Sequence, residues 1–129
     1  MTNKKNTKKQ KPLILIVSPP SDLQIGLQAL LTAHLEVDVY VTSEGSSALK
    51  AIARNSHDLV ILDQDLPLNS GLEITQEIKS NWPDMRMIVF VNNDAGKEIF
   101  STLGVDQIIT KGFPPQELID EIKLLLQIQ

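Results

Sequence analysis

Five short apolar runs, separated by segments with helical periodicity, constrain this sequence more than any other feature. Each run has the length of a strand and is too short for an ordinary helix, which predicts strands buried on both faces. Between the runs, apolar residues recur three or four positions apart, as on one face of a helix. The chain of 129 residues suits a single domain. The five runs are Leu13–Val17, Val37–Val41, Leu59–Leu62, Met87–Val91 and Gln107–Thr110.

Residues that commonly open helices stand before each helical pattern, which supports the same alternation. Strand and helix units in succession favour a parallel, doubly wound sheet with helices on both faces, a fold of the α/β class. In such a sheet the functional edge lies at the carboxyl ends of the strands. The start signals are Pro19-Pro20, Ser43, Asn69-Ser70, Asp94 and Pro114-Pro115.

The first eleven residues differ from the rest of the chain in charge. They hold five of the 12 basic residues, although the net charge of the whole chain is −4. A short lysine-rich run without aromatic residues predicts a disordered basic tail over residues 1–11, followed by one domain over residues 12–129. The alternative is an arm that binds nucleic acid or a membrane surface.

Composition excludes several classes of function. The sequence contains no cysteine, which excludes disulfides, thiol catalysis and cysteine metal clusters. No apolar run approaches the roughly 20 residues of a membrane-spanning helix, and Leu13–Val17 is too short for the core of a signal peptide. We therefore expect a cytoplasmic protein.

Only two ionisable residues fall at the predicted carboxyl edge, Asp63 after the third strand and Lys111 after the fifth. A buried aspartate needs a partner, so we expect these two side chains to pair. The pair allows two interpretations: a structural link between two strands, or a reactive carboxylate with a lysine that holds an incoming anion. His34 and His57 lie at element ends, and we expect both on the surface.

Two segments carry a family resemblance, DLVILDQDLPLNSGLEI over residues 58–74 and GVDQIITKGF over residues 104–113. The first contains an Asp-x-x-x-Pro-x-x-x-Gly signature at Asp63, Pro67 and Gly71. In these features the chain resembles the receiver domain of bacterial response regulators, of the CheY-like superfamily, over essentially residues 12 to 128. The resemblance implies a flavodoxin-like fold of five βα units with strand order 2-1-3-4-5.

The resemblance also implies roles for single residues. The aspartate at the Asp63 position accepts a phosphoryl group from a histidine kinase in this family. The residue at the Asp65 position lends its backbone carbonyl to Mg²⁺, and the lysine at the Lys111 position pairs with the phosphoryl oxygens. Such chemistry consists mostly of positioning and charge compensation.

The sequence departs from the family at the metal corner. Active receivers also hold Mg²⁺ with an acidic pair directly after the first strand, and that pair falls on Ser18 and Pro19 here. Neither residue supplies a carboxylate, and Mg²⁺ gives up its water reluctantly. We therefore expect weak Mg²⁺ binding at most, through Asp63 and Asp65. Ser18 is expected to cap the first helix instead.

Further departures concern the switch between inactive and active receivers. The family's Ser or Thr after the fourth strand falls on Val91, which donates no hydrogen bond from its side chain. The aromatic residue of the fifth strand falls on Ile108. Gly112 replaces the proline that follows the lysine, so we expect a trans peptide bond there. These departures favour a degenerate receiver, or pseudo-receiver.

Three functions remain open from the sequence. The first is a non-enzymatic module that binds signalling proteins, a histidine kinase or another two-component partner, with weak or no Mg²⁺-dependent phosphorylation. The second is a functional receiver that a histidine kinase phosphorylates on Asp63. The third is a flavodoxin-like binder of a small ligand, although no glycine-rich phosphate loop follows the first strand.

The last predicted helix offers an interaction surface. Leu124 and Ile128 fall outside its apolar stripe, either as ordinary surface residues or as a docking face. A homodimer through the helix after Asp94, the strand at Gln107–Thr110 and the last helix is one form of such docking. We expect neither nucleic acid nor a membrane as a direct partner. The sequence leaves open whether the chain works alone or belongs to a longer protein.

Overall fold

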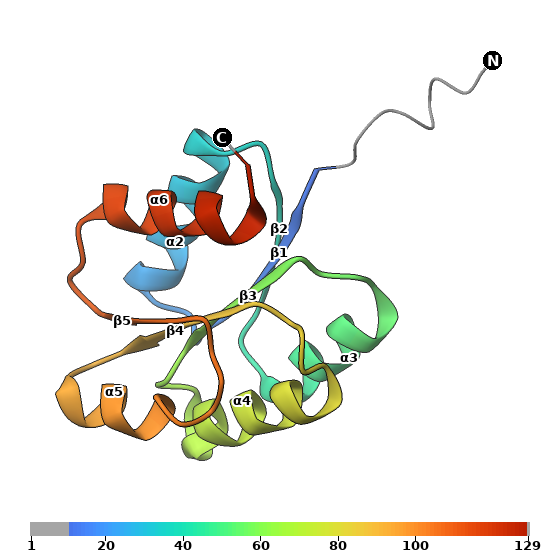
Figure 1. The fold of residues 1–129 in the computed structure, drawn as a ribbon, viewed down its shortest axis with the longest axis vertical. Coiled ribbons are helices and arrows are strands. Elements are labelled where there is room, and N and C mark those ends of the chain that lie inside the picture. The colour runs from blue at the N-terminus through green and yellow to red at the C-terminus, as the bar shows by residue number, and fades with distance from the viewer. Residues whose placement is uncertain (1–10, 129) are drawn as a thin grey trace.

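The computed structural model describes residues 11–128 and shows one parallel sheet between two layers of helices (Figure 1). The strand order is β2-β1-β3-β4-β5, which confirms the predicted flavodoxin-like topology. The predicted tail, residues 1–11, lies outside the described residues except for Lys11. The strands are β1 (Leu13–Val17), β2 (Asp38–Thr42), β3 (Leu59–Asp63), β4 (Met87–Val91) and β5 (Gln107–Thr110).

Burial separates the central strands from the edge strands. β1, β3 and β4 are buried along nearly their whole length, whereas β2 and β5 are only partly buried. The prediction that all five strands are buried on both faces is therefore wrong for β2 and β5. An edge strand has a neighbour on one side only, so solvent reaches some of its side chains.

The helices divide between the two faces of the sheet (Figure 1). On one face, α2 (Asp22–His34) and α6 (Pro115–Leu126) enclose one apolar core. On the other face, α3 (Gly45–Arg54), α4 (Ser70–Asn81) and α5 (Asp94–Phe100) enclose a second core, and the short 3₁₀ helix η1 (Pro67–Asn69) leads into α4. Among residues 11–128, no helix has the length and apolar character needed to cross a membrane.

The start of α2 differs from the prediction. Ser21 is the N-cap, and its Oγ accepts a hydrogen bond from the Gln24 N–H at 3.1 Å. Ser18 does not cap the helix, because its Oγ donates to the Pro19 carbonyl oxygen at 3.1 Å. A residue that precedes proline is biased away from helical backbone angles. The Pro19-Pro20 pair therefore delays the helix beyond Ser18.

The end of α6 corrects the predicted interaction face. Gln127 takes left-handed backbone angles, and its N–H donates to the Leu124 carbonyl while the Ile128 N–H donates to the Lys123 carbonyl. This pair of bonds is a Schellman motif, which turns the chain back across the helix end. Ile128 consequently packs against the core that α2 and α6 enclose. Leu124 remains 72% exposed, so it alone fits the prediction of an exposed apolar residue.

The two histidines have different surroundings. His34, at the end of α2, is exposed as expected. His57 is buried, and its Nδ1 lies 3.0 Å from the Asn55 carbonyl oxygen, so the expectation of a surface position is wrong for this residue. It lies two residues before β3, where the chain enters the centre of the sheet.

Leu68, in η1, generates a prediction about stability. Its φ of 61° lies in the left-handed region, and its side chain is 91% exposed. Left-handed backbone costs an ordinary residue roughly 1–2 kcal/mol, and asparagine adopts it more readily. We predict that Leu68→Asn raises the free energy of unfolding by about 0.5–1 kcal/mol in urea denaturation.

The matched control is Leu124→Asn, because Leu124 is also exposed but lies within α6. Asparagine is a poorer helix former than leucine, so this variant should lose stability. A loss of stability in Leu68→Asn as well would show that contacts of the Leu68 side chain outweigh its backbone strain.

Candidate functional site

Parallel pairing brings the ends of three strands together at one edge of the sheet. Asp63 is the last residue of β3, Asn92 follows β4, and Lys111 follows β5. The strand pairing continues one step beyond the strands, because the Gln64 N–H donates to the Phe90 carbonyl at 3.0 Å and the Lys111 N–H donates to the Val91 carbonyl at 2.9 Å. Side chains at these positions therefore lie next to one another.

The expected ion pair between Asp63 and Lys111 is present at this edge. Lys111 Nζ lies 2.8 Å from Asp63 Oδ1, and the aspartate side chain is only 4% exposed. The same oxygen accepts the backbone N–H of Asp65 at 2.9 Å. A buried carboxylate thus has both a cation and an amide donor, the partners that a buried charge requires.

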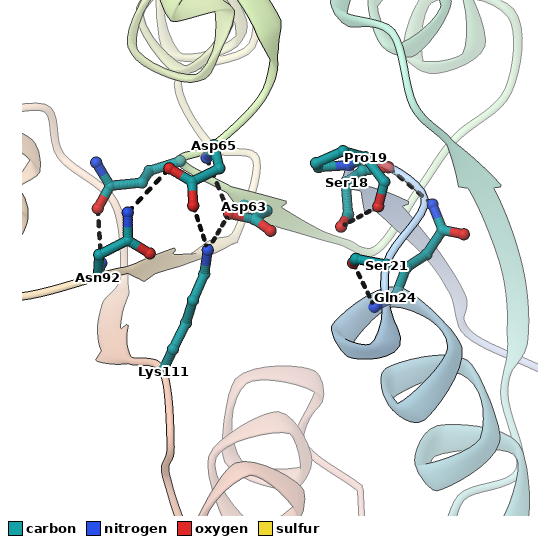
Figure 2. A network of polar contacts seen from close by, with 9 residues as sticks. Ser18, Pro19, Ser21, Gln24, Asp63, Asp65, Asn92 and Lys111 are labelled. Carbon is teal, nitrogen blue, oxygen red and sulfur yellow. Dashed lines mark hydrogen bonds and ion pairs between the residues drawn. The ribbon is translucent and has the colours of Figure 1, made fainter.

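The side chain of Asp65 belongs to the same network, which the sequence analysis did not predict (Figure 2). Its Oδ2 accepts a hydrogen bond from Lys111 Nζ at 2.8 Å, and its Oδ1 accepts one from Asn92 Nδ2 at 2.9 Å. The resemblance assigned only the backbone carbonyl of Asp65 a role. Here its carboxylate joins the chain segments that follow β3, β4 and β5.

Gln64 fixes the neighbouring backbone. Its Oε1 accepts the Asn92 N–H at 2.7 Å. Glycine is required at position 71, because a Cβ there would lie 2.6 Å from the Gln64 backbone carbonyl oxygen. A Cβ on Gly96 would lie 2.5 Å from Gln64 Oε1, so the end of the Gln64 side chain would have to move. The sequence analysis missed Gln64 and gave Asn92 no role. Both residues directly follow a strand, β3 or β4, and that position in the sequence could have indicated that they lie at the site.

Charge pairing shifts two pKa values in this network. The hydrogen bond from Lys111 holds the pKa of Asp65 below its ordinary value, partial burial acts in the opposite direction, and the Asn92 amide adds to the lowering. Burial of the Lys111 ammonium would by itself lower its pKa. The hydrogen bonds to Asp63 and Asp65, together with the charge attraction of both carboxylates, outweigh burial and raise the pKa of Lys111.

Ser18 and Pro19 lie on the other side of Asp63 (Figure 2). Ser18 is buried, its N–H donates to the Thr42 carbonyl at 3.0 Å, and its own carbonyl accepts from Gln24 Nε2 at 2.7 Å. Its hydroxyl is directed to the Pro19 carbonyl. Hydrogen bonds within the protein therefore hold the backbone of this corner without a charged group.

The residues at the predicted switch positions are apolar and packed. Val91 is fully buried at the end of β4, and Ile108 in β5 packs against the core shared with α3, α4 and α5. The Lys111–Gly112 peptide bond is trans, as expected. Gly112 takes a φ of 92°, which is accessible to glycine.

The residues present fit a magnesium ion poorly. Mg²⁺ prefers near-octahedral oxygen ligands at about 2.1 Å. Within residues 11–128, no group of three or more Asp, Glu, His or Cys side chains is arranged to hold a metal ion. Asp63 and Asp65 both contact Lys111, and Ser18 and Pro19 bring no carboxylate.

The lowered pKa of Asp65 gives a prediction for acid stability. A carboxylate with a lowered folded-state pKa stabilises the fold above its ordinary pKa of 3.8 and loses that contribution as the pH falls through the folded-state value. Asp65→Asn should therefore be less stable than the wild type near neutral pH, by less than about 1 kcal/mol because Asp65 is half exposed. The difference should shrink as the pH falls below 3.8 and Asp65 becomes protonated in the folded state.

Urea denaturation across this pH range measures the effect. Asp84→Asn is the control, because Asp84 is exposed and forms no salt bridge with any residue from 11 to 128. If the two variants gave the same pH profile, the contribution assigned to the Asp65 contacts would be refuted.

Comparison with known proteins places this geometry in a family. The family model of the response regulator receiver domain matches residues 14–123. The response regulator ArlR of Staphylococcus saprophyticus is 31% identical over 117 residues, which are 90% of this chain and 53% of ArlR. The chain thus spans about half the length of this relative.

Solved structures agree in fold. The response regulator TrrA of Thermotoga maritima, solved in complex with Mg²⁺ and BeF, is 29% identical, with a TM-score of 0.80 and coverage of 89% of this chain and 99% of that chain. The signal receiver domain of an HD domain-containing protein from Pseudomonas fluorescens is 23% identical, with a TM-score of 0.84 and coverage of 94% and 90%. The chain therefore belongs to the response regulator receiver family of two-component signal transduction.

Proposed function

We propose that this receiver is a degenerate one, a non-enzymatic module that signals through protein contacts with little or no Mg²⁺-dependent phosphorylation of Asp63. The observation that carries the proposal is the corner after β1. Ser18 and Pro19 stand where an acidic pair is expected, and their hydrogen bonds run to Thr42, Gln24 and each other.

Electrostatics supports this proposal. A cluster of like-charged carboxylates repels itself unless a cation is bound. Here Asp63 and Asp65 are the carboxylates at the edge, and Lys111 contacts both at 2.8 Å. The protein's own lysine therefore offsets part of the negative charge of the two carboxylates, which lowers the need for a metal ion.

The packed switch positions support it as well. A receiver that responds to phosphorylation needs a group that donates to the phosphoryl oxygens and a side chain that changes rotamer. Val91 is buried and apolar, and Ile108 lies in the core in place of an aromatic ring. We infer that the binding surface takes its shape without a phosphoryl group.

A second candidate function is phosphorylation of Asp63 by a histidine kinase. It is favoured by the Asp63–Lys111 contact, since a lysine beside an acceptor carboxylate neutralises charge that develops in phosphoryl transfer. TrrA, the relative solved with Mg²⁺ and BeF, illustrates a receiver that binds this pair of ions. No specific observation favours the third candidate, a flavodoxin-like binder of a small ligand.

The face formed by α5, β5 and α6 is the proposed interaction surface. It contains a hollow of about 590 Å³ lined by residues such as Lys97, Ile108 and Glu117. Leu124 on α6 and Ile99 on α5 are large apolar residues with at least half of their surface exposed. We propose that signalling proteins in the cytoplasm, or a second copy of this chain, bind here, and that nucleic acid and membranes do not.

One prediction of the proposed function concerns Mg²⁺ binding at the corner after β1. Wild-type protein should show no saturable amide NMR shifts at Asp63, Asn92 or Lys111 with millimolar Mg²⁺ or with added beryllofluoride. The double variant Ser18→Asp with Pro19→Asp should bind Mg²⁺ at least about tenfold more tightly, because it restores two carboxylates.

The neutral double variant Ser18→Asn with Pro19→Asn is the matched control for this experiment, since it changes the same positions without charge. Saturable shifts in the wild type, first with Mg²⁺ and again with beryllofluoride, would contradict the proposal and establish the second candidate.

Another prediction of the proposed function concerns the interaction surface formed by α5, β5 and α6. Leu124→Glu should weaken self-association or partner binding in sedimentation velocity by about tenfold, because a charge enters an apolar contact. Ile25→Glu is the control, since Ile25 is 65% exposed on α2, which is not one of the three elements that form this face. Sedimentation and partner binding unchanged by Leu124→Glu would remove this surface from consideration.

A further inference from the structure

The Asp65 carboxylate is more tightly held than its surface position requires. Its side chain is 49% exposed, yet Lys111 Nζ lies 2.8 Å from Oδ2 and Asn92 Nδ2 donates to Oδ1 at 2.9 Å. A solvated aspartate needs neither partner. A cation and an amide that converge on one carboxylate form an oxyanion-binding arrangement.

We propose that Asp65 is a built-in anion that occupies this arrangement. Its carboxylate takes the donors of Lys111 and Asn92, excludes an external oxyanion such as inorganic phosphate, and holds the β4–α5 junction in one conformation. The proposal rests on the proposed function. It adds that an internal contact of Asp65, instead of a transferred phosphoryl group, sets the conformation of the β4–α5 junction.

Charge balance explains why an external anion is excluded. Lys111 brings one positive charge, while Asp63 and Asp65 bring two negative charges within 2.8 Å of it. The site is therefore net negative as it stands. An incoming oxyanion would have to displace Asp65 from Lys111 and Asn92 and would still lie beside Asp63, whose charge repels it.

The hydrogen bonds show how the same contact fixes the junction. Asn92 is held twice by the segment that follows β3, through its side chain to Asp65 and through its backbone N–H to Gln64 Oε1. The next residue, Asn93, caps α5 by accepting the Gly96 N–H at 3.0 Å. Asp65 thus connects Lys111 to the start of α5 through Asn92.

Hydrogen exchange tests the fixed junction. In the absence of Mg²⁺ and of any phosphoryl donor, amide exchange at Asn92, Gly96 and Lys97 should be about fivefold faster or more in Asp65→Ala and in Asn92→Ala than in the wild type. Asn92→Ala keeps the charge of the site. Asp84→Ala is the control, since it removes an exposed carboxylate from the α4–β4 loop, and it should leave these rates unchanged.

Binding of inorganic phosphate tests the anion site. Asp65→Ala should show saturable amide shifts at Asn92 and Lys111, whereas the wild type and Asp84→Ala should show none. Equal phosphate binding by Asp65→Ala and Asp84→Ala would assign the effect to net charge and overturn the proposal. So would unchanged exchange in both Asp65→Ala and Asn92→Ala, or the lack of phosphate binding by Asp65→Ala.

These measurements are separable from the test of the proposed function. They use phosphate alone and variants of the internal contact, without Mg²⁺ or beryllofluoride. A wild type that binds Mg²⁺ and beryllofluoride would refute the degenerate receiver. Only the Asp65 and Asn92 variants decide whether Asp65 is the built-in anion.

Discussion

The ion pair between Asp63 and Lys111 is the interaction on which the organisation of this site depends. The central strands are buried on both faces, so their polar side chains are confined to the strand ends. A carboxylate only 4% exposed is costly there unless a cation reaches it. That cation comes from the end of β5, two strands away, and it arrives because β3, β4 and β5 are parallel neighbours.

The corner after β1 determines how much negative charge this edge carries. Ser18 is held by one backbone hydrogen bond to Thr42 and by the Gln24 side chain, and it adds no charge. One lysine can then contact both remaining carboxylates, Asp63 and Asp65. The uncharged residues after β1 and the contacts of Lys111 with the two carboxylates together set the charge balance of this edge.

The hydrophobic pattern predicted the strands correctly, whereas features set by short turns were predicted wrongly. The strands β1, β4 and β5 have the predicted bounds, because apolar runs between turn residues leave few alternatives. The cap of α2 and the place of Ile128 were wrong. In both cases a turn of a few residues, Pro19-Pro20 in one and the left-handed Gln127 in the other, redirected the chain. Hydrophobic periodicity carries no information about such turns.

The sequence by itself determined the class of fold, the parallel sheet and the meeting of Asp63 with Lys111, since the hydrophobic pattern and the ends of buried strands require them. The receiver signature pointed to the same edge. Only the tertiary structure decided that Asp65 and Asn92 join the pair and that Leu124 but not Ile128 is exposed. These outcomes depend on side-chain directions and on distances of a few ångströms between loops that are far apart in the chain, which no spacing in the sequence encodes.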